Sequence, residues 1–148
     1  MSTTPGSGDA AAGATGVAER MGVKPGTVVM EVGWDEDVDD SLREAIEERS
    51  GEELLGDDSD EVVDLVLLWF REDDGDLVDA LVDAIAPLAD NGVIWLLTPR
   101  RGRSGYVEPS DISEAASIAG LSQTSLVTVS SEWAAARLVG RKARGERR

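Results

Sequence analysis

Clustered carboxylates in two short segments are the residues of this sequence that could bind a ligand or do chemistry. The first segment is "GWDEDVDD" (33–40), the second is "REDDGD" (71–76), and a third, "TPRRGRSGYVEP" (98–109), carries arginines instead. Each follows an apolar run that predicts a buried strand, and ligands of parallel α/β sheets bind at the carboxyl ends of the strands. We therefore expect one site, with the candidate contact residues Gly33, Trp34, Asp35, Glu36, Asp37, Arg71, Asp73, Asp74, Arg100 and Arg101.

A purely structural role also accounts for the acidic residues, because both acidic segments precede predicted helices. Unpaired N–H groups and the helix dipole favour Asp and Glu at a helix N-terminus by about 0.3–1 kcal/mol each. Asp37 is a candidate N-cap of the first helix, and Asp73 or Asp74 of the second. In this interpretation, carboxylates fill the position where a cofactor phosphate would otherwise bind.

Two functional interpretations stand beside the structural one. In the first, Asp35, Asp37 and a carboxylate from residues 72–76 hold a divalent cation, since Mg²⁺ and Ca²⁺ prefer oxygen ligands. In the second, the acidic residues form a docking surface for a basic protein, with Trp34 as an anchor, since tryptophan is enriched at interface hot spots. Trp34 could equally fold over the sheet as a core residue.

Composition excludes several classes of chemistry. The 148 residues include no cysteine and no histidine, which excludes disulfides, thiol catalysis, serine triads and zinc sites. The net charge of −16 is uneven: residues 31–79 carry −18, whereas residues 100–148 carry +4. So acidic a chain lacks the basic footprint of a nucleic-acid-binding protein. No apolar run is long enough for a membrane span, and the N-terminus lacks a signal-peptide layout, so we expect a cytoplasmic protein.

Apolar periodicity predicts the elements that position the site. Continuous apolar runs predict strands at 27–33, 61–70 and 93–99, and "SGEELL" (50–55) predicts a weak edge strand or a turn. Helical spacing predicts helices over 38–49, from Leu77 through Leu88 to a stop at "NG", and over 108–120. Residues 124–141 predict two strands around a tight turn at Ser131–Trp133.

This alternation predicts an α/β fold, a three-layer sandwich with a mostly parallel sheet and a C-terminal antiparallel hairpin. The predicted domain spans residues 20–140, between a disordered tail at 1–19 and a basic tail at 141–148. Trp69 and Trp95 lie inside predicted strands and are expected in the core, whereas Trp133 is expected to hold the hairpin. The sequence does not determine an oligomeric state.

Most of the chain resembles the family DUF3052, a domain of unknown function that is abundant in actinobacteria. The stretches that carry the resemblance are "GVKPGTVVMEVGWDEDVDD", the long block from "DLVLLWF" to "GLSQTS", and "SSEWAAARLV". Together they cover about residues 20–142. The resemblance implies a small Rossmann-like α/β domain in the cytoplasm and carries over no established activity.

A remoter resemblance is to the Rossmann-like methyltransferases that use S-adenosylmethionine. "VVMEVG" is similar to their first motif, and "DLVLLWF" with "LADNGVIWLLTP" is similar to a later strand–helix–strand block. However, Gly33 is followed by Trp34 and acids, without the further glycines that let the family's backbone approach the cofactor. The acid that holds the ribose has no counterpart here unless it is Glu52 or Glu53. These departures imply that the fold is shared and that cofactor binding is lost.

We therefore expect a non-enzymatic binding or regulatory module, without a cofactor, that contacts a basic protein surface through its acidic face. The first alternative is a divergent, methyltransferase-like enzyme in which Glu31, Asp35 and Arg71 are the polar groups of a small-ligand site. The second alternative is the divalent-metal protein. An open cavity of about 300 Å³ or more beneath residues 33–37 would favour the enzyme.

Overall fold

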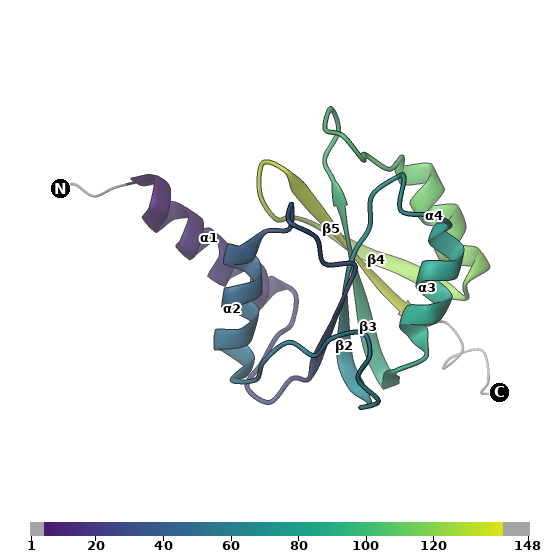
Figure 1. Cartoon of the computed structure of the whole chain (residues 1–148), viewed down its shortest axis with the longest axis horizontal. Coiled ribbons are helices and arrows are strands. Elements are labelled where there is room, and N and C mark those ends of the chain that lie inside the picture. Colours follow the sequence, from purple (N-terminus) through teal and green to yellow (C-terminus); the bar gives the residue numbers. More distant parts are fainter. Residues whose placement is uncertain (1–4, 141–148) are drawn as a thin grey trace.

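The computed structural model describes the backbone from residue 5 to residue 140 and side chains from residue 13 onward. Five strands form one twisted sheet in the order β1-β2-β3-β5-β4 (Figure 1). Strands β1, β2 and β3 are parallel, whereas β5 is antiparallel to both β3 and β4. The strands are β1 (Val29–Val32), β2 (Val63–Trp69), β3 (Leu88–Pro99), β4 (Leu121–Thr128) and β5 (Trp133–Gly140).

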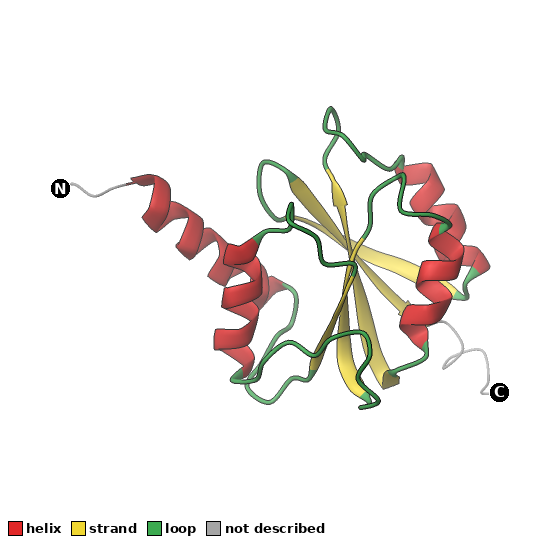
Figure 2. Cartoon of the chain, viewed as in Figure 1, coloured by secondary structure: helices red, strands yellow, loops and turns green. Residues whose placement is uncertain are grey.

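Helices cover both faces of this sheet, which makes the three-layer sandwich that the sequence predicts (Figure 2). One face is covered by α1 and α2, and the other by α3 and α4. The helices are α1 (Pro5–Arg20), α2 (Asp40–Ser50), α3 (Leu77–Ile85) and α4 (Pro109–Ile118). In the described part of the chain, no helix has both the length and the apolar character that crossing a membrane requires.

Strand β2 shows how the sequence builds two cores with one sheet. Side chains alternate between the faces of a strand, so Leu65 and Leu67 pack towards α1 and α2, whereas Val66 and Leu68 pack towards α3 and α4. A strand covered on both sides has no polar face, which explains its continuous apolar sequence. Full burial of such side chains stabilises the fold by about 1.5–3 kcal/mol each.

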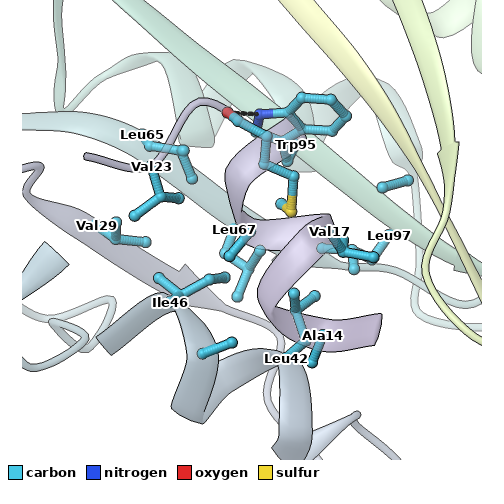
Figure 3. Close-up of a cluster of buried hydrophobic side chains, with 14 of the residues drawn as sticks. Ala14, Val17, Val23, Val29, Leu42, Ile46, Leu65, Leu67, Trp95 and Leu97 are labelled. Carbon is cyan, nitrogen blue, oxygen red and sulfur yellow. Dashed lines mark hydrogen bonds between the residues drawn. The ribbon is translucent and has the colours of Figure 1, made fainter. Parts of the chain in front are cut away.

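Trp69 and Trp95 are both buried, which confirms their predicted place in the core. Trp95 is among the largest side chains between the sheet and the helices α1 and α2 (Figure 3). Its indole Nε1–H donates a 3.0 Å hydrogen bond to the carbonyl of Met21, just after α1. The polar end of the ring is thereby satisfied inside an apolar layer, as buried tryptophans require.

The predicted disordered tail over residues 1–19 is wrong for the part that forms α1. Ala14, Val17, Ala18 and Met21 follow one another at helical spacing and are all buried in the core with α2. This apolar stripe is narrow and consists mostly of small residues. In an Ala- and Gly-rich segment such a stripe gives only a weak helical pattern. Residues 1–4 and the predicted basic tail at 141–148 lie outside the described residues.

Helix α3 ends earlier than its apolar spacing predicts. The helix stops at Ile85, and β3 begins at Leu88 rather than at Val93. Pro87 has no backbone N–H and cannot continue the helical hydrogen bonding. Its carbonyl instead accepts a 2.9 Å hydrogen bond from the N–H of Val63, which starts the pairing of β2 with β3. The helix-like position of Leu88 therefore belongs to a strand.

The predicted N-caps are wrong for both helices. Asp39, not Asp37, caps α2 by accepting a hydrogen bond from the N–H of Leu42. Asp76, not Asp73 or Asp74, caps α3 in the same way. Asp39 and Asp76 have the extended backbone that an N-cap requires. The carboxylates that precede them in the sequence remain available for other contacts.

Two further segments refine the predicted topology. "SGEELL" contributes one residue to the sheet, because Leu55 forms a parallel bridge with Met30 beside β1. The C-terminal hairpin is antiparallel as predicted, but it begins at Leu121, and Trp133 is the first residue of β5 rather than part of the turn. Bonds from the N–H groups of Val129 and Ser130 to the Trp133 carbonyl close the hairpin.

Candidate functional site

A cleft of about 390 Å³ lies at the carboxyl edge of the parallel strands. The loops after β1, β2 and β3 contribute to it, and the connection between β4 and β5 closes one side. We call this cavity the acidic cleft. Its charged lining consists of Asp35, Asp37, Asp73, Asp74 and Glu132, with Arg71 and Arg103 as the cations.

Gly33 sets the position of the first loop. Its φ of 84° lies in the left-handed region that only glycine adopts easily. A Cβ at this position would lie 2.2 Å from the carbonyl oxygen of Trp69, at the end of β2. The backbone after β1 therefore rests directly against the end of β2, and this contact leaves no room for a ligand between the two.

Glu31 is buried at the end of β1, and side chains of the protein occupy both of its carboxylate oxygens. The indole Nε1–H of Trp69 donates a 2.9 Å hydrogen bond to it. Arg43 of α2 donates two more, at 2.7 Å from Nε and 3.0 Å from Nη2. The hydrogen bond to Glu31 raises the pKa of Arg43, so the guanidinium keeps its positive charge.

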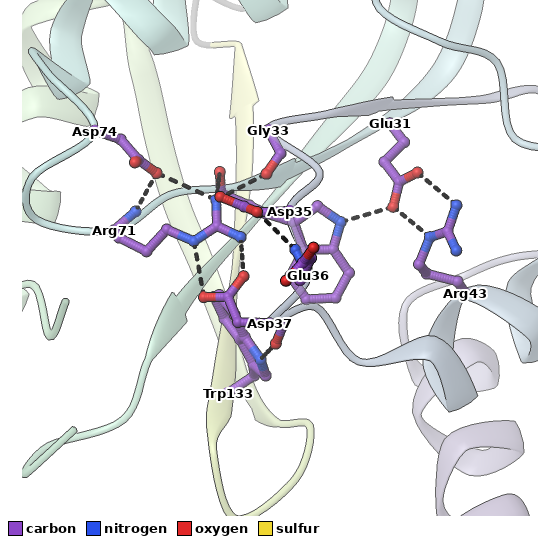
Figure 4. A network of polar contacts seen from close by, with 10 residues as sticks. Glu31, Gly33, Asp35, Glu36, Asp37, Arg43, Arg71, Asp74 and Trp133 are labelled. Atoms are coloured by element: carbon purple, nitrogen blue, oxygen red, sulfur yellow. Dashed lines mark hydrogen bonds and ion pairs between the residues drawn. The ribbon is translucent and has the colours of Figure 1, made fainter. Parts of the chain in front are cut away.

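Arg71 is the centre of a second network, shown in Figure 4. Its side chain is only 10% exposed, and it forms a two-pronged ion pair with the carboxylate of Asp37. Its Nη1 also donates to the Gly33 carbonyl at 2.7 Å and to Asp74 at 3.2 Å. One guanidinium thus joins the loop after β1 to the loop after β2.

The ring of Trp133, which lines the cleft, packs against this guanidinium. The Arg71 guanidinium carbon lies 5.4 Å from the centre of the Trp133 ring, a cation–π distance. The indole N–H of Trp133 donates a 3.0 Å hydrogen bond to the Asp37 carbonyl. Trp133 also packs edge-on against Trp69, with ring centres 4.9 Å apart. Its role therefore extends beyond the hairpin that the sequence predicts it to hold.

The electrostatics of the cleft follow from these contacts. Hydrogen bonding from Arg71 lowers the pKa of the Asp37 carboxyl below its usual value of 3.8. Burial acts to lower the pKa of Arg71, but hydrogen bonds to Asp37 and Asp74 outweigh it and raise that pKa. Both groups are therefore charged at neutral pH and neutralise one another within the network.

The structure brings most of the predicted site residues together and separates a few. Gly33, Asp35, Asp37, Arg71, Asp73 and Asp74 meet at the acidic cleft. Glu36 is exposed at its margin, where its N–H bonds to the Asp35 carboxylate at 2.7 Å. Trp34 is 54% exposed, so the prediction of a core residue folded over the sheet is wrong and the alternative of an exposed anchor remains.

Arg100 and Arg101 are not part of the cleft lining. Arg100 bonds to the Ser130 carbonyl at 3.1 Å, and the Arg101 guanidinium stacks on the Tyr106 ring. Arg103 lines the cleft instead, 3.5 Å from Glu132. The sequence placed all three arginines in one loop, but Gly102 and Gly105 turn that loop, and the turns decide which side chain faces the cleft.

The proposed metal ligands do not assemble. In the part of the chain that the structure describes, no three carboxylates lie where they could hold a metal ion. Asp37 and Asp74 are both engaged by Arg71, whereas Asp35 accepts a bond from the neighbouring backbone. The metal-binding alternative is therefore wrong for the residues that it named.

Glu132 and Trp133 are site residues that the sequence did not assign to the cleft. Trp133 starts β5 and Glu132 directly precedes it. Because β5 is antiparallel to β3, the beginning of β5 lies beside the end of β3. The signal was present in the hairpin prediction, because a strand that follows a hairpin turn starts at the same edge where its partner ends. Only the pairing order showed that this edge is the carboxyl edge.

The fold and the position of the cleft define a class, the Rossmann-like α/β domain. The chain is similar to a SAM-dependent methyltransferase from Aquifex aeolicus, with a TM-score of 0.53 and 14% identity over 85% of this chain and 88% of that one. It is also similar to the pyocyanin biosynthetic protein PhzM, with a TM-score of 0.65 and 11% identity over 86% of this chain and 54% of that one. At these identities the likeness concerns the fold alone.

The chain belongs to the family described as Protein of unknown function (DUF3052), which matches residues 18–142. Its relatives include uncharacterized proteins from Mycobacterium tuberculosis (strain ATCC 25618 / H37Rv) and Mycobacterium bovis. Each is 53% identical to this chain over 135 residues, which cover 91% of this chain and 85% of the relative. The resemblance seen in the sequence is thereby confirmed.

Proposed function

We propose that this protein is a non-enzymatic binding module whose acidic cleft and Trp34 contact a basic segment of a partner protein. The observation that carries the proposal is the position of the Arg71 guanidinium. It bonds to the Gly33 carbonyl and to Asp37 at the point where the loop after β1 meets the end of β2. Ligands of this class of fold bind at that point. Because the Arg71 side chain of the protein itself occupies it, the observation supports loss of the cofactor.

The residues around this point do not fit S-adenosylmethionine. The Gly33 backbone contacts Trp69, and the carboxylate of Glu31 is saturated by Trp69 and Arg43. Where a second strand would flank β1, the described residues contribute only the bridging residue Leu55. Glu52 and Glu53, the candidates for the acid that holds the ribose, are exposed before it. The carboxylate of the cofactor's methionine end would also approach Asp35 and Asp37, a repulsive arrangement.

Two carboxylates of the cleft remain available to a partner. Arg71 is neutralised by Asp37 and Asp74, and Arg103 lies beside Glu132. Within the described residues, Asp35 and Asp73 form no ion pair, and both are exposed. Trp34 adjoins Asp35 with an exposed ring, so a Lys or Arg side chain could meet a carboxylate and an aromatic face together. This combination supports a basic partner.

A direct test is the affinity of the full chain for a fluorescent octa-arginine peptide, measured by anisotropy at several salt concentrations. We expect the double variant Asp35→Asn/Asp73→Asn to bind more weakly than the wild type. Trp34→Ala should lose roughly 2- to 5-fold in affinity, which corresponds to a cation–π contribution of about 0.5–1 kcal/mol.

The matched control is Glu44→Gln/Glu48→Gln, which removes the same charge from exposed positions of α2 outside the cleft. Equal loss of affinity in the two double variants would show that the peptide senses net charge and not the cleft. Binding that persists at ~1 M salt, where the screening length is about 3 Å, would also contradict the proposed electrostatic contact.

The volume of the acidic cleft favours one second candidate, a divergent enzyme that binds a small ligand. At about 390 Å³ the cleft reaches the size of small-molecule sites, and Asp35 and Asp37 line it, as expected from the sequence for a site that would favour the enzyme. Its excess of carboxylates favours a cationic ligand. Calorimetry with S-adenosylmethionine separates the candidates: our proposal expects no binding heat at millimolar ligand, whereas saturable binding would support the enzyme.

We also infer a cytoplasmic location, supported by the high content of acidic residues, which favours solubility. Fractionation of cells that produce the tagged full chain tests this inference. Recovery in the membrane or extracellular fraction would contradict it.

A further inference from the structure

Strand β4 forms one end of the sheet. Within the described residues it pairs only with β5, and its outer edge is open. Among the described residues, no backbone hydrogen bond links residues 121–128 to any segment beyond β5. Half of the N–H and C=O groups of β4 therefore point outward without a protein partner, as in any edge strand.

The sequence of β4 lacks the charges and prolines that protect many edge strands. Edge strands are commonly blocked by charged residues, prolines or a covering element. The strand "LSQTSLVT" contains neither a charge nor a proline, and Leu126 is 69% exposed. One irregularity between Gln123 and Ser125 interrupts the pairing with β5. Five of the eight residues of this uncharged strand are exposed to solvent.

An apolar groove of about 230 Å³ adjoins this edge, between α4 and the hairpin. Leu126 lies at the groove on the α4 side of the sheet, since it pairs with the buried Ala136 of the core formed with α3 and α4. Tyr106, Val107 and Ile112 line the opposite wall. The groove offers an incoming apolar side chain a place beside the strand.

The charge distribution indicates which partner this edge can bind. Residues 31–79 carry −18, whereas residues 100–140 contain four basic and four acidic side chains and are neutral. Strand β1, next to the acidic loops, lies at the opposite end of the sheet from β4. Two copies of a chain with net charge −16 repel one another least when they meet at β4.

We propose that the β4 edge binds the β4 edge of a second copy of this chain in antiparallel orientation. A two-fold axis perpendicular to the sheet joins the two sheets into one, and the outward N–H and C=O groups of each strand pair. The same axis places both Leu126 side chains on the α4 side, beside the grooves, whose mainly apolar lining also includes Arg100 and Arg101. The acidic cleft of each copy stays open, so this pairing is independent of the proposed function.

The test is the mass of the full chain in solution, measured by sedimentation equilibrium and light scattering. We expect a dimer of two 15.7 kDa chains that dissociates on dilution. Leu126→Lys introduces a charge at the contact, and two such charges face each other in a dimer, so this variant is expected to be a monomer. Gln123→Lys, on the same strand, is a second variant with the same expectation.

The matched control is Val62→Lys, since Val62 is 68% exposed near the start of β2, far from the β4 edge in the sheet. This variant is expected to remain a dimer. Circular dichroism and melting curves establish that all three variants fold, because each replaces an exposed side chain. Hydrogen exchange of the full chain adds a direct readout: β4 amides are protected in the wild type and exchange faster in Leu126→Lys.

Two results would overturn the proposal. One is a wild-type chain that stays monomeric throughout the concentration series. The other is a dimer that survives both Leu126→Lys and Gln123→Lys, because a different surface would then hold the two copies together.

Discussion

We call Glu31 and Gly33, beside the acidic cleft, its base, and the exposed residues Trp34, Asp35 and Asp73 its rim; the environments of the two are opposite. At the base, Glu31 and Gly33 are held against Trp69 at the end of β2. At the rim, Trp34, Asp35 and Asp73 are exposed. The base is closed by contacts within the chain, whereas neither carboxylate of the rim forms an ion pair within the described residues. The loop after β1 therefore packs against the fold at one end and is exposed to solvent at the other, as the proposed contact with a partner requires.

Two carboxylate–guanidinium pairs show the same difference on a smaller scale. Glu31 pairs with Arg43 where the carboxylate side chain is only 8% exposed. Asp37 pairs with Arg71 where the carboxylate side chain is 54% exposed. A buried carboxylate that loses its partner stays desolvated, but an exposed one regains water. Breaking the inner pair should therefore cost more stability than breaking the outer pair.

The largest effect is expected for Gly33→Ala, at the base. The new Cβ would meet the Trp69 carbonyl at 2.2 Å in a left-handed conformation, so we expect a loss of about 3 kcal/mol or more in the free energy of unfolding. Urea denaturation measures it. Gly102→Ala is the control, because Gly102 has a similar φ of 89° and nothing within 4 Å of its Cβ position. Equal losses would mean that the contact with Trp69 contributes nothing.

A smaller effect is expected for Glu31→Gln. The amide keeps the shape of the side chain but places a donor against the Arg43 guanidinium, so the unfolding free energy should fall by about 2–3 kcal/mol. A double-mutant cycle with Arg43→Gln measures how much of this loss belongs to the pair. If the two single losses simply add, Glu31 acts through Trp69 alone and the inner pair is not coupled.

Arg71→Met should cost less, about 1–2 kcal/mol, because Asp37 can regain water when the guanidinium is removed. The variant should also change the fluorescence of the protein, since Trp133 loses the cation beside its ring. Chemical denaturation followed by tryptophan emission checks both effects. A loss of unfolding free energy as large as that of Glu31→Gln would contradict the expected difference between the inner and the outer ion pair.

The same pair predicts a dependence on acid. Arg71 lowers the pKa of Asp37 below 3.8, so its contribution is complete above that pH and is lost as the pH falls through the lower, folded-state pKa. Between about pH 5 and pH 2, the wild type should lose stability more steeply than Arg71→Met. Denaturation at a series of pH values tests this, and identical slopes would contradict the assignment to Asp37.

The smallest effect on stability is expected for Trp34→Ala, at the rim. An exposed side chain without packing partners should change the unfolding free energy by less than about 0.5 kcal/mol. Affinity for the arginine peptide should nevertheless fall. A strong loss of stability in melting curves would show that Trp34 belongs to the fold rather than to the surface used for recognition.

Long apolar strands were predictable from the sequence, since β2 and the second half of β3 have no polar face. So were α2, α4 and the antiparallel hairpin, because their signals are local. The segment of α1 was missed because its apolar stripe consists of small residues, and the end of α3 was misplaced because Leu88 suits both a helix face and a strand. In both places the local signal was weak or shared by two structures.

The sequence by itself determined that a parallel α/β sheet carries charged loops at its carboxyl edge, because periodicity and turn residues act over a few positions. Tertiary structure decided which of those charges pair. Asp37 and Arg71 are 34 residues apart, and Trp133 is 96 residues from the Asp37 carbonyl that it contacts. The order of the strands brings these residues together, and hydrogen-bond geometry then selects Asp37 for Arg71 and leaves Asp35 and Asp73 to the solvent. Pairing over such separations depends on the whole sheet and has no local signature.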